Sequence, residues 1–384
     1  MTAVARPTKT VVMTIAAAYV LSGICQPLIM TLCKHAGLAN SSAQLYMFFY
    51  YLGPAMLVFT LQTQSRNDDE DDDATAKEPT NNTNTNDTTM QQQRQQQQQQ
   101  QQQHYPSRNM ILKATVIAAF DICAQGLNYT GASLAGPTIF AVVYSSVTVW
   151  AAVFSRLFLG RTLAATQWLA VLVVFGGLVV TATNSVSLGE DVTHGTGLVL
   201  VGSAMHALTY VMSESVMTVG AERLTIRQNA AIQGLVACVG LFVWQLLYTW
   251  PRYDALILEP AKAAGTTVCM AAAIFGGFLL ANFVHSISFY HTLKYYPGGS
   301  TSAGIMKALQ AVLVFVAAHW LYCGRIGGQE MCFTTSKLVS LLTVVGGVML
   351  FGFAATERQG DSPSTNRRLQ GYSRIESQEG VEAV

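Results

Sequence analysis

Lys307 is a single lysine within a long apolar stretch, residues 299–322. An ionisable side chain is costly to place in an apolar environment, which makes it a candidate for binding rather than for packing. Pro297 to Ser300 has the composition of a helix start, where free amide groups carry partial positive charge. Lys307 and this helix start would together suit a phosphate or a carboxylate, and Gln310 lies near the same face. The competing interpretation is that the lysine stem lies in lipid while its ammonium reaches water.

A second polar stripe lies in residues 110–128, where Asp121, Gln125 and Asn128 recur at the i, i+4 and i+7 spacing of one helix face. The Asp121 carboxylate would pair with Lys307 in an empty site, or would carry a proton. A structural stripe of hydrogen bonds between helices accounts for the same spacing.

Residues 196–218 contain a similar stripe, with His206 and Tyr210 on one face and Glu214 slightly off it. Histidine titrates near neutral pH, so His206 could bind a substrate or relay a proton. A lone buried histidine bonded to a neighbour is the competing interpretation. Glu214, like Asp121, is a candidate for proton coupling.

Two further apolar stretches carry rings that could contact a ligand. His285 and Tyr290 lie in residues 266–290, and Tyr144 lies in the middle of residues 133–155. An aromatic ring can stack on a nucleobase, because every base has a π-face. Aromatic residues near the ends of membrane helices are more commonly interfacial anchors, and the position of Tyr144 favours the binding interpretation.

The seven cysteines show no paired metal-ligand spacing, so no metal or other cofactor is expected. Cys323 and Cys332 flank a connection between two apolar stretches; we expect free thiols there, with a disulfide in an oxidising compartment as the alternative. The sequence has no Walker motif and no convincing nucleophile–base pair, which disfavours an enzyme.

The composition indicates the environment of these residues. The chain has 384 residues, 51% of them hydrophobic, with 22 Lys or Arg and 21 Asp or Glu. Residues 62–108 hold 12 of these charges and residues 357–384 hold nine, which leaves 22 in the other 309 residues, or roughly 7% against ~25% in soluble domains. Such a chain could not cover a water-exposed surface, so a soluble enzyme is excluded. The net charge of +1 gives no reason to expect nucleic acid as a partner.

The apolar stretches are long enough to cross a bilayer as helices. We expect an all-α membrane protein with ten transmembrane helices, and a tight hairpin at residues 128–132 between the third and the fourth. The ten predicted spans are residues 11–33, 43–61, 110–128, 133–155, 165–183, 196–218, 229–249, 266–290, 299–322 and 335–355.

The distribution of Lys and Arg predicts the orientation. With the N-terminus in the cytosol, 16 of the 22 basic residues fall on the cytosolic side and five on the outside, and Lys307 lies within a span. The positive-inside rule therefore places both termini in the cytosol. The N-x-[ST] motifs at Asn40 and Asn128 then fall in external loops that hug the membrane.

Two segments are too polar to form a core. Residues 62–108 combine an acidic run with a glutamine tract, and we expect a disordered cytosolic loop there and a disordered tail at 357–384. The predicted organisation is 1–61 (first two spans), 62–108 (loop), 109–189 (spans three to five), 190–356 (spans six to ten) and 357–384 (tail).

The two halves share short patterns. Phe175-Gly176-Gly177-Leu178 in the fifth span corresponds to Val345-Gly346-Gly347-Val348 in the tenth, and Gly160-Arg161 after the fourth span corresponds to Gly324-Arg325 after the ninth. Each half holds five predicted spans, and because five is odd the second half would be inverted relative to the first. Inverted repeats are the architecture of many secondary transporters.

These ten spans resemble the drug/metabolite transporter superfamily (EamA-like). The stretch from Phe289 to Pro297, followed by Ala303 to Gln310, loosely resembles the nucleotide-sugar transporter branch of the solute carriers, and Pro137-Thr138 with Ser145-Ser146 is similar to the matching part of that branch. The resemblance implies two inverted five-helix repeats, a substrate-contacting role for Tyr290 and a place in the Golgi or endoplasmic reticulum rather than the plasma membrane.

Three functions follow as hypotheses. The first is secondary-active, alternating-access exchange of a polar anionic metabolite such as a nucleotide sugar; the others are proton-coupled export of a neutral or cationic metabolite, and a non-transporting membrane scaffold. The expected partners are the lipid bilayer and a small-molecule substrate, and the sequence is compatible with a homodimer. The candidate substrate-binding residues are Lys307, Tyr290, Tyr144, Gln125, Asn128, His206, Tyr210, Gln310 and His285, and the candidates for proton coupling are Asp121 and Glu214.

Overall fold

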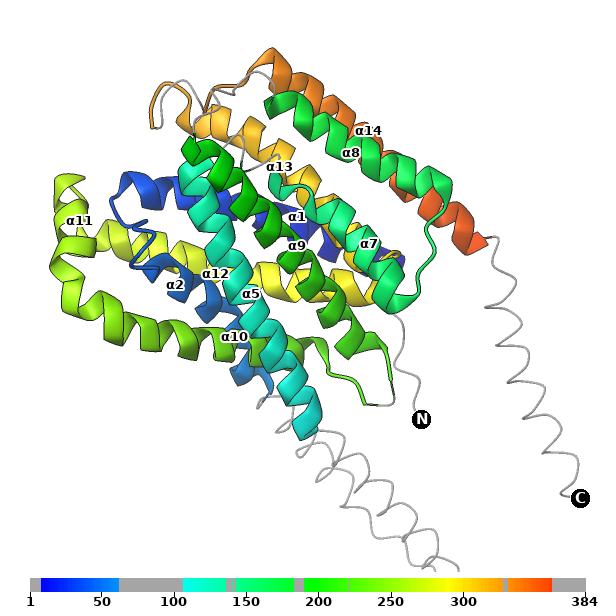
Figure 1. Cartoon of the computed structure of the whole chain (residues 1–384), viewed down its shortest axis with the longest axis horizontal. Coiled ribbons are helices and arrows are strands. Elements are labelled where there is room, and N and C mark those ends of the chain that lie inside the picture. The colour runs from blue at the N-terminus through cyan, green and yellow to red at the C-terminus, as the bar shows by residue number, and fades with distance from the viewer. Residues whose placement is uncertain are drawn as a thin grey trace, which may run out of the picture.

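A computed structural model describes residues 8–61, 106–135, 140, 143–182, 190–220, 222–326 and 331–360. Within these residues the chain is helical and has no strand (Figure 1). The main helices are α1 (Lys9–His35), α2 (Leu45–Ala55), α5 (Arg108–Ala135), α7 (Val147–Leu159), α8 (Ala165–Ala182), α9 (Glu190–Thr218), α10 (Ile226–Trp244), α11 (Glu259–Ala263), α12 (Val268–Tyr295), α13 (Ser300–Tyr322) and α14 (Thr335–Gly360).

Seven of the helical stretches are long and apolar enough to cross a membrane, by length and composition. Three shorter apolar helices, Leu45–Leu61, Val147–Leu159 and Ala165–Gly177, accompany them. Together they overlap the ten predicted spans one for one, which confirms an all-helical chain with several apolar helices. Ten membrane crossings remain a prediction.

The helices pack as pairs from opposite halves of the chain. In the bundle, α5 lies against α9, α1 against α12, and α2 against α10 and α12 (Figure 1). The short helix α7 contacts α9 and α13, and α13 also contacts α1. The pair α8 and α14 lies along one edge of the molecule, beside α13.

The α8–α14 pair meets at the glycines that the sequence comparison matched. A methyl group added at Gly177 would lie 2.9 Å from Thr343 Cβ, and one added at Gly347 would lie 2.7 Å from Val174 Cγ2. Each glycine thus lets the backbone of one helix approach the side chains of the other, as small residues do between membrane helices. The contact is reciprocal between the two halves.

The largest buried apolar cluster lies at the end of the bundle where α13 begins, which we call the α13-start end. It joins side chains from α1, α5, α9, α12 and the α9–α10 connection, among them Tyr19, Ile117, Met217, Leu293 and Leu224. Apolar side chains are therefore closely packed at the α13-start end.

The hairpin predicted at residues 128–132 is wrong. These residues are helical, and α5 continues to Ala135. Asn128 is 1% exposed and faces α9, where a methyl group on Gly202 would collide with its side chain. An asparagine, a threonine and a glycine in succession resemble a turn, but here they form the face on which α9 packs. The motif at Asn128 is consequently buried rather than in an external loop.

Two other expectations concern the polar segments. The loop at 62–108 lies outside the described residues up to 105, and Arg108 already begins α5. The tail was expected from residue 357, but α14 continues to Gly360, and residues 361–384 lie outside the described part.

The second predicted span is interrupted at Met56, after which helix resumes to Leu61.

Candidate functional site

A cavity lies between α2, α5, α9, α10, α12 and α13, and encloses about 610 Å³ of space free of protein atoms, part of it open to solvent. The side chains that line it are largely aromatic or polar, and two of them are a potential cation and anion from different helices. They are Tyr50, Tyr51, Pro54, Ala118, Asp121, His206, Thr209, Tyr210, Ser213, Gln233, Gly234, His285, Ser286, Phe289, Tyr290 and Lys307.

Lys307 projects from the second turn of α13 into this cavity. Its Nζ lies 3.2 Å from Nε2 of His285 on α12 and 5.8 Å from the ring centroid of Tyr19 on α1. Among the described residues, no carboxylate lies within ion-pair distance of this ammonium. An ammonium with no carboxylate at ion-pair distance among those residues can accept an anion from a ligand.

Asp121 lines the same cavity from α5 and is held by three neighbours. Tyr51 donates to Oδ2 at 2.6 Å, Thr209 donates to Oδ1 at 3.4 Å, and His206 Nε2 lies 3.5 Å from Oδ1. Tyr144 lies behind His206, with its hydroxyl 3.4 Å from Nδ1. The chain Tyr144–His206–Asp121 could pass a proton along hydrogen bonds, or could simply orient the carboxylate.

Tyr290 and Tyr210 are placed by aromatic packing and by one strong hydrogen bond. The Tyr290 hydroxyl donates to Gln233 Oε1 at 3.0 Å, and Gln233 in turn donates to Ser213 at 3.1 Å. The ring of Phe289 separates the two tyrosines, 4.6 Å from Tyr210 and 5.0 Å from Tyr290. These rings give the cavity a wall that could stack on a planar ligand group.

The structure therefore brings six of the eleven sequence-predicted residues to the cavity. Those that line it are Lys307, Tyr290, His206, Tyr210, His285 and Asp121. The other five, namely Tyr144, Gln125, Asn128, Gln310 and Glu214, lie outside its lining.

Three of these five side chains make contacts between helices outside the cavity lining. Gln125 donates to the hydroxyl of Tyr50 at 3.4 Å, and therefore touches a lining residue rather than the cavity. Gln310 donates to the backbone carbonyl of Tyr19 at 2.8 Å and ties α13 to α1. Asn128 packs into the α5–α9 contact described above.

Glu214 occupies the helix start that was expected to attract the substrate. Its carboxylate, 0% exposed, accepts the backbone N–H of Ser300 at 2.8 Å and is ion-paired with Arg161. Ser155 on α7 and Ser300 also share a hydrogen bond of 2.7 Å. The positive end of α13 is thus already satisfied by the protein's own carboxylate. Among the described residues that line the cavity, Lys307 is the lysine that can meet a ligand anion.

Several residues that line the cavity were not predicted from the sequence. Tyr50 and Tyr51 come from α2 and Gln233 from α10, both in spans that carried no predicted site residue. Two adjacent tyrosines in the middle of an apolar stretch, away from the interface where tyrosine is common, were the available signal. The position of Gln233 could not be recognised, because polar residues near a span end are ordinary.

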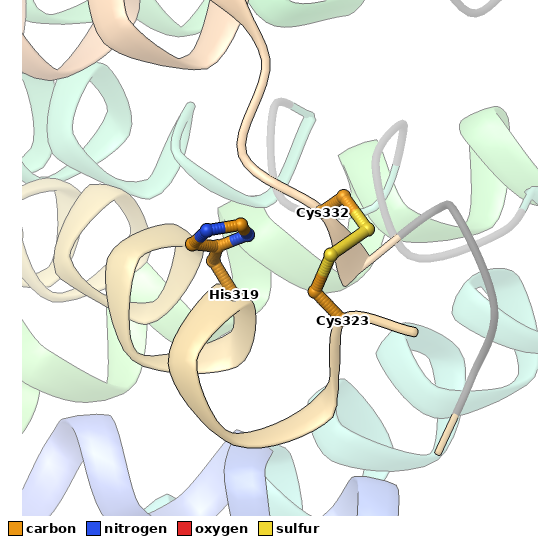
Figure 2. A group of neighbouring side chains, drawn as sticks. All are labelled: His319, Cys323 and Cys332. Carbon is orange, nitrogen blue, oxygen red and sulfur yellow. A yellow bond between two sulfur atoms is a disulfide. The ribbon is translucent and has the colours of Figure 1, made fainter. Parts of the chain in front are cut away.

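Cys323 and Cys332 form a disulfide, so the expectation of two free thiols is wrong (Figure 2). Cys323 follows α13, and Cys332 lies just before α14. His319 lies beside them, and the three side chains are grouped closely enough to hold a metal ion. Bonded sulfurs are not thiolates, however, and His319 Nδ1 accepts the backbone N–H of Phe333 at 3.1 Å, so the group does not fit a metal while the disulfide is present.

Several apolar helices long enough to span, with a polar cavity among them, define a multi-pass integral membrane protein. Residues 94–183 match the model of the EamA-like transporter family. Solute carrier family 35 member F6 from Homo sapiens, and the same protein from Pongo abelii, are each 25% identical to this chain over 130 residues. That match covers 34% of this chain and 35%, about a third, of each relative.

A solved crystal structure of a protein matches across 92% of this chain and 100% of its own, with a TM-score of 0.52. At 12% identity this likeness concerns the fold alone. The family match and the two relatives support the drug/metabolite transporter superfamily, with a loose link to the solute carrier 35 family.

Proposed function

We propose that this protein is a secondary-active transporter that exchanges a polar anionic metabolite, such as a nucleotide sugar, by alternating access. One observation carries the proposal: the Lys307 ammonium faces a cavity between the helices and has no carboxylate within ion-pair distance among the described residues. Placing a cation inside the membrane costs free energy, so a cation at such a position is a candidate for binding a ligand. The aromatic wall of Tyr210, Phe289 and Tyr290 would receive the planar part of the substrate.

Two inverted repeats are part of the proposal, and the helix contacts support them. If the first five spans correspond to the last five, the α5–α9 contact corresponds to α12–α1, and α7–α9 corresponds to α13–α1; all four contacts are present. The reciprocal contacts of Gly177 and Gly347 fit the same pseudo-two-fold relation. Inverted repeats place the substrate near the midplane and allow one bundle to rock against the other.

Alternating access requires the α13-start end to open. The links that must then part are the ion pair of Arg161 with Glu214 and the hydrogen bond of Ser155 with Ser300. All four side chains lie close to the N-terminus of α13, and each link joins a residue of the first half to one of the second. The polar links can re-form with water when this end opens, which apolar packing alone could not do.

The orientation with both termini in the cytosol, in a Golgi or endoplasmic reticulum membrane, also belongs to the proposal. The Lys and Arg count assigns the α13–α14 connection to the outside. That connection carries the Cys323–Cys332 disulfide, and disulfides persist in oxidising compartments. The two arguments are independent and agree.

Proton-coupled export of a neutral or cationic metabolite is the second candidate, and the Asp121–His206 contact favours it. A pH gradient that drives uptake in wild-type protein, and that has no effect in Asp121→Asn, would select this candidate. A membrane scaffold is the third. Deletion of residues 64–106 separates it from both transporters, because a transporter would keep its activity and a scaffold would lose its binding.

Reconstituted vesicles preloaded with nucleotides or nucleotide sugars test the proposal. Losing a charge-assisted hydrogen bond costs about 1.5–3 kcal/mol, so Lys307→Ala is expected to raise the KM for the exchanged anion roughly 10- to 100-fold. Lys307→Arg, which keeps the charge, should retain more activity. Lys262→Ala removes an exposed lysine of α11 and is the matched control. Equal exchange by wild-type protein and Lys307→Ala would refute the anion site.

A further inference from the structure

His285 lies between Lys307 and a serine on the first helix. Its Nε2 is 3.2 Å from Lys307 Nζ, and its Nδ1 is 3.0 Å from Ser22 Oγ. Ser22 Oγ also lies 2.7 Å from the backbone carbonyl of Ala18, one turn back along α1. Ser22 is 7% and His285 is 6% exposed, so water does not readily replace these contacts.

Donor and acceptor chemistry fixes the direction of every bond in this chain. A charged lysine can only donate, so Nε2 of His285 must be the acceptor and carry no hydrogen. The hydrogen of a neutral imidazole then lies on Nδ1 and is donated to Ser22 Oγ. Ser22 in turn donates its own hydrogen to the Ala18 carbonyl, which can only accept. His285 is therefore neutral, with both ring nitrogens in use.

Two aromatic rings pack against the imidazole and set the plane of its ring. Its ring centroid lies 4.8 Å from that of Tyr19, on α1, and the ring is stacked on Phe289 at 6.4 Å, one turn further along α12. Because both nitrogens are already bonded, His285 has no free donor for a substrate even though it lines the cavity.

We propose that Ser22 and His285 are positioning residues, which hold the Lys307 ammonium at the cavity wall with its remaining hydrogens directed to the ligand. This inference rests on the proposed function, because it gives Lys307 its role. A lysine has a flexible four-carbon stem, and a ligand that must first order it binds less tightly than one that meets it already placed. His285 thus contributes to affinity without touching the substrate.

The direction of the bonds can be tested without a substrate. Protein labelled with ¹⁵N-histidine and held in lipid nanodiscs should give a His285 signal, assigned by its loss in His285→Phe, with a protonated Nδ1 and a bare Nε2. Lys307→Met should shift the Nε2 signal most, and Ser22→Ala should shift the Nδ1 signal most. A protonated Nε2, whether in the other tautomer or in an imidazolium, would overturn the inference, because such a nitrogen cannot accept from Lys307.

Binding measurements test the consequence, with uridine diphosphate and inorganic phosphate as probes. His285→Phe keeps the ring packing and removes both nitrogens, and we expect roughly a 10-fold weaker Kd, the loss of one hydrogen bond to a charged group. His285→Gln, whose amide oxygen can reach the Nε2 position, should stay within about threefold of wild type. Ser22→Ala, one step further from the ligand, should weaken binding about threefold.

The matched control is His291→Phe, because His291 lies on the same helix but does not line the cavity; its binding should be unchanged. Probe binding by His285→Phe at the wild-type Kd, together with a loss in Lys307→Ala, would overturn the positioning role while the anion site stands. If wild-type protein binds neither probe nor any other anion, the proposed function fails, and the histidine spectrum still decides whether the three-residue chain exists.

Discussion

Two corners of the molecule share a sequence pattern and differ in how they are held. Gly160-Arg161 follows α7, and Gly324-Arg325 follows α13. Both glycines have positive φ, 63° and 69°. Arg161, however, is paired with the buried Glu214, whereas Arg325 is exposed and has no carboxylate within ion-pair distance among the described residues. A disulfide lies at the second corner instead.

The two corners differ in which parts of the chain their links join. The Arg161–Glu214 pair joins the first half of the chain to the second, so it must part whenever the two halves separate at that end. The disulfide joins α13 to the segment before α14, both in the second half, so it stabilises without restricting motion between the halves. A reversible bond is found where movement is proposed, and a covalent one where it is not.

The largest effect is expected at the first corner. Arg161→Met leaves the Glu214 carboxylate, which is 0% exposed, without its cation, and should lower the stability to unfolding by about 3 kcal/mol. Arg325→Met at the second corner should change it by less than about 0.5 kcal/mol. Thermal midpoints in one detergent compare the two. Equal losses would show that the buried ion pair does not distinguish the corners.

Reducing the disulfide should have the next largest effect. Its two cysteines are nine residues apart, and closing a loop of that length contributes about 2–3 kcal/mol in the chain-entropy account. The double variant Cys323→Ser/Cys332→Ser should therefore melt earlier, and exchange activity at low temperature should persist. Loss of exchange in a folded double variant would mean that the bond restrains the moving parts after all.

The smallest difference between the corners is expected at the glycines, which the corners have in common. A methyl group at either Gly160 or Gly324 meets no atom within 4 Å, so only the left-handed backbone opposes alanine. Each Gly→Ala variant should cost about 1 kcal/mol, and the two costs should be equal. Thermal midpoints again provide the measurement. Unequal costs would indicate that one corner carries strain that its geometry does not reveal.

The sequence predicted the apolar helices well and the contacts between them poorly. Apolar runs mark helices because lipid-facing and core-facing residues are both apolar, but the same uniformity hides where a helix ends. Asn128 was therefore taken for a turn residue although it lies inside α5. A helix end was better marked at Gly160, where a basic residue follows a glycine.

The candidate site shows the same limit. Lys307 could be recognised alone, because a cation in an apolar run is conspicuous. Its partners could not: His285 is 22 residues away on another helix, and Ser22 is a further 263 residues from His285. Glu214 was recognised as a buried acid, but only the fold places Arg161 beside it. Residue type shows which side chain would be costly to bury. Only the three-dimensional arrangement shows which partner offsets that cost.

The pairing of α8 with α14 has a consequence for the order of synthesis. Ala182 ends α8 and Thr335 begins α14, so the ribosome makes four long helices between them. During that time the face of α8 that carries Gly177 has no α14 to pack against. Chains that stop before α14 would leave this face open permanently, and quality-control proteases that recognise unassembled membrane helices would then have a target that the finished protein conceals.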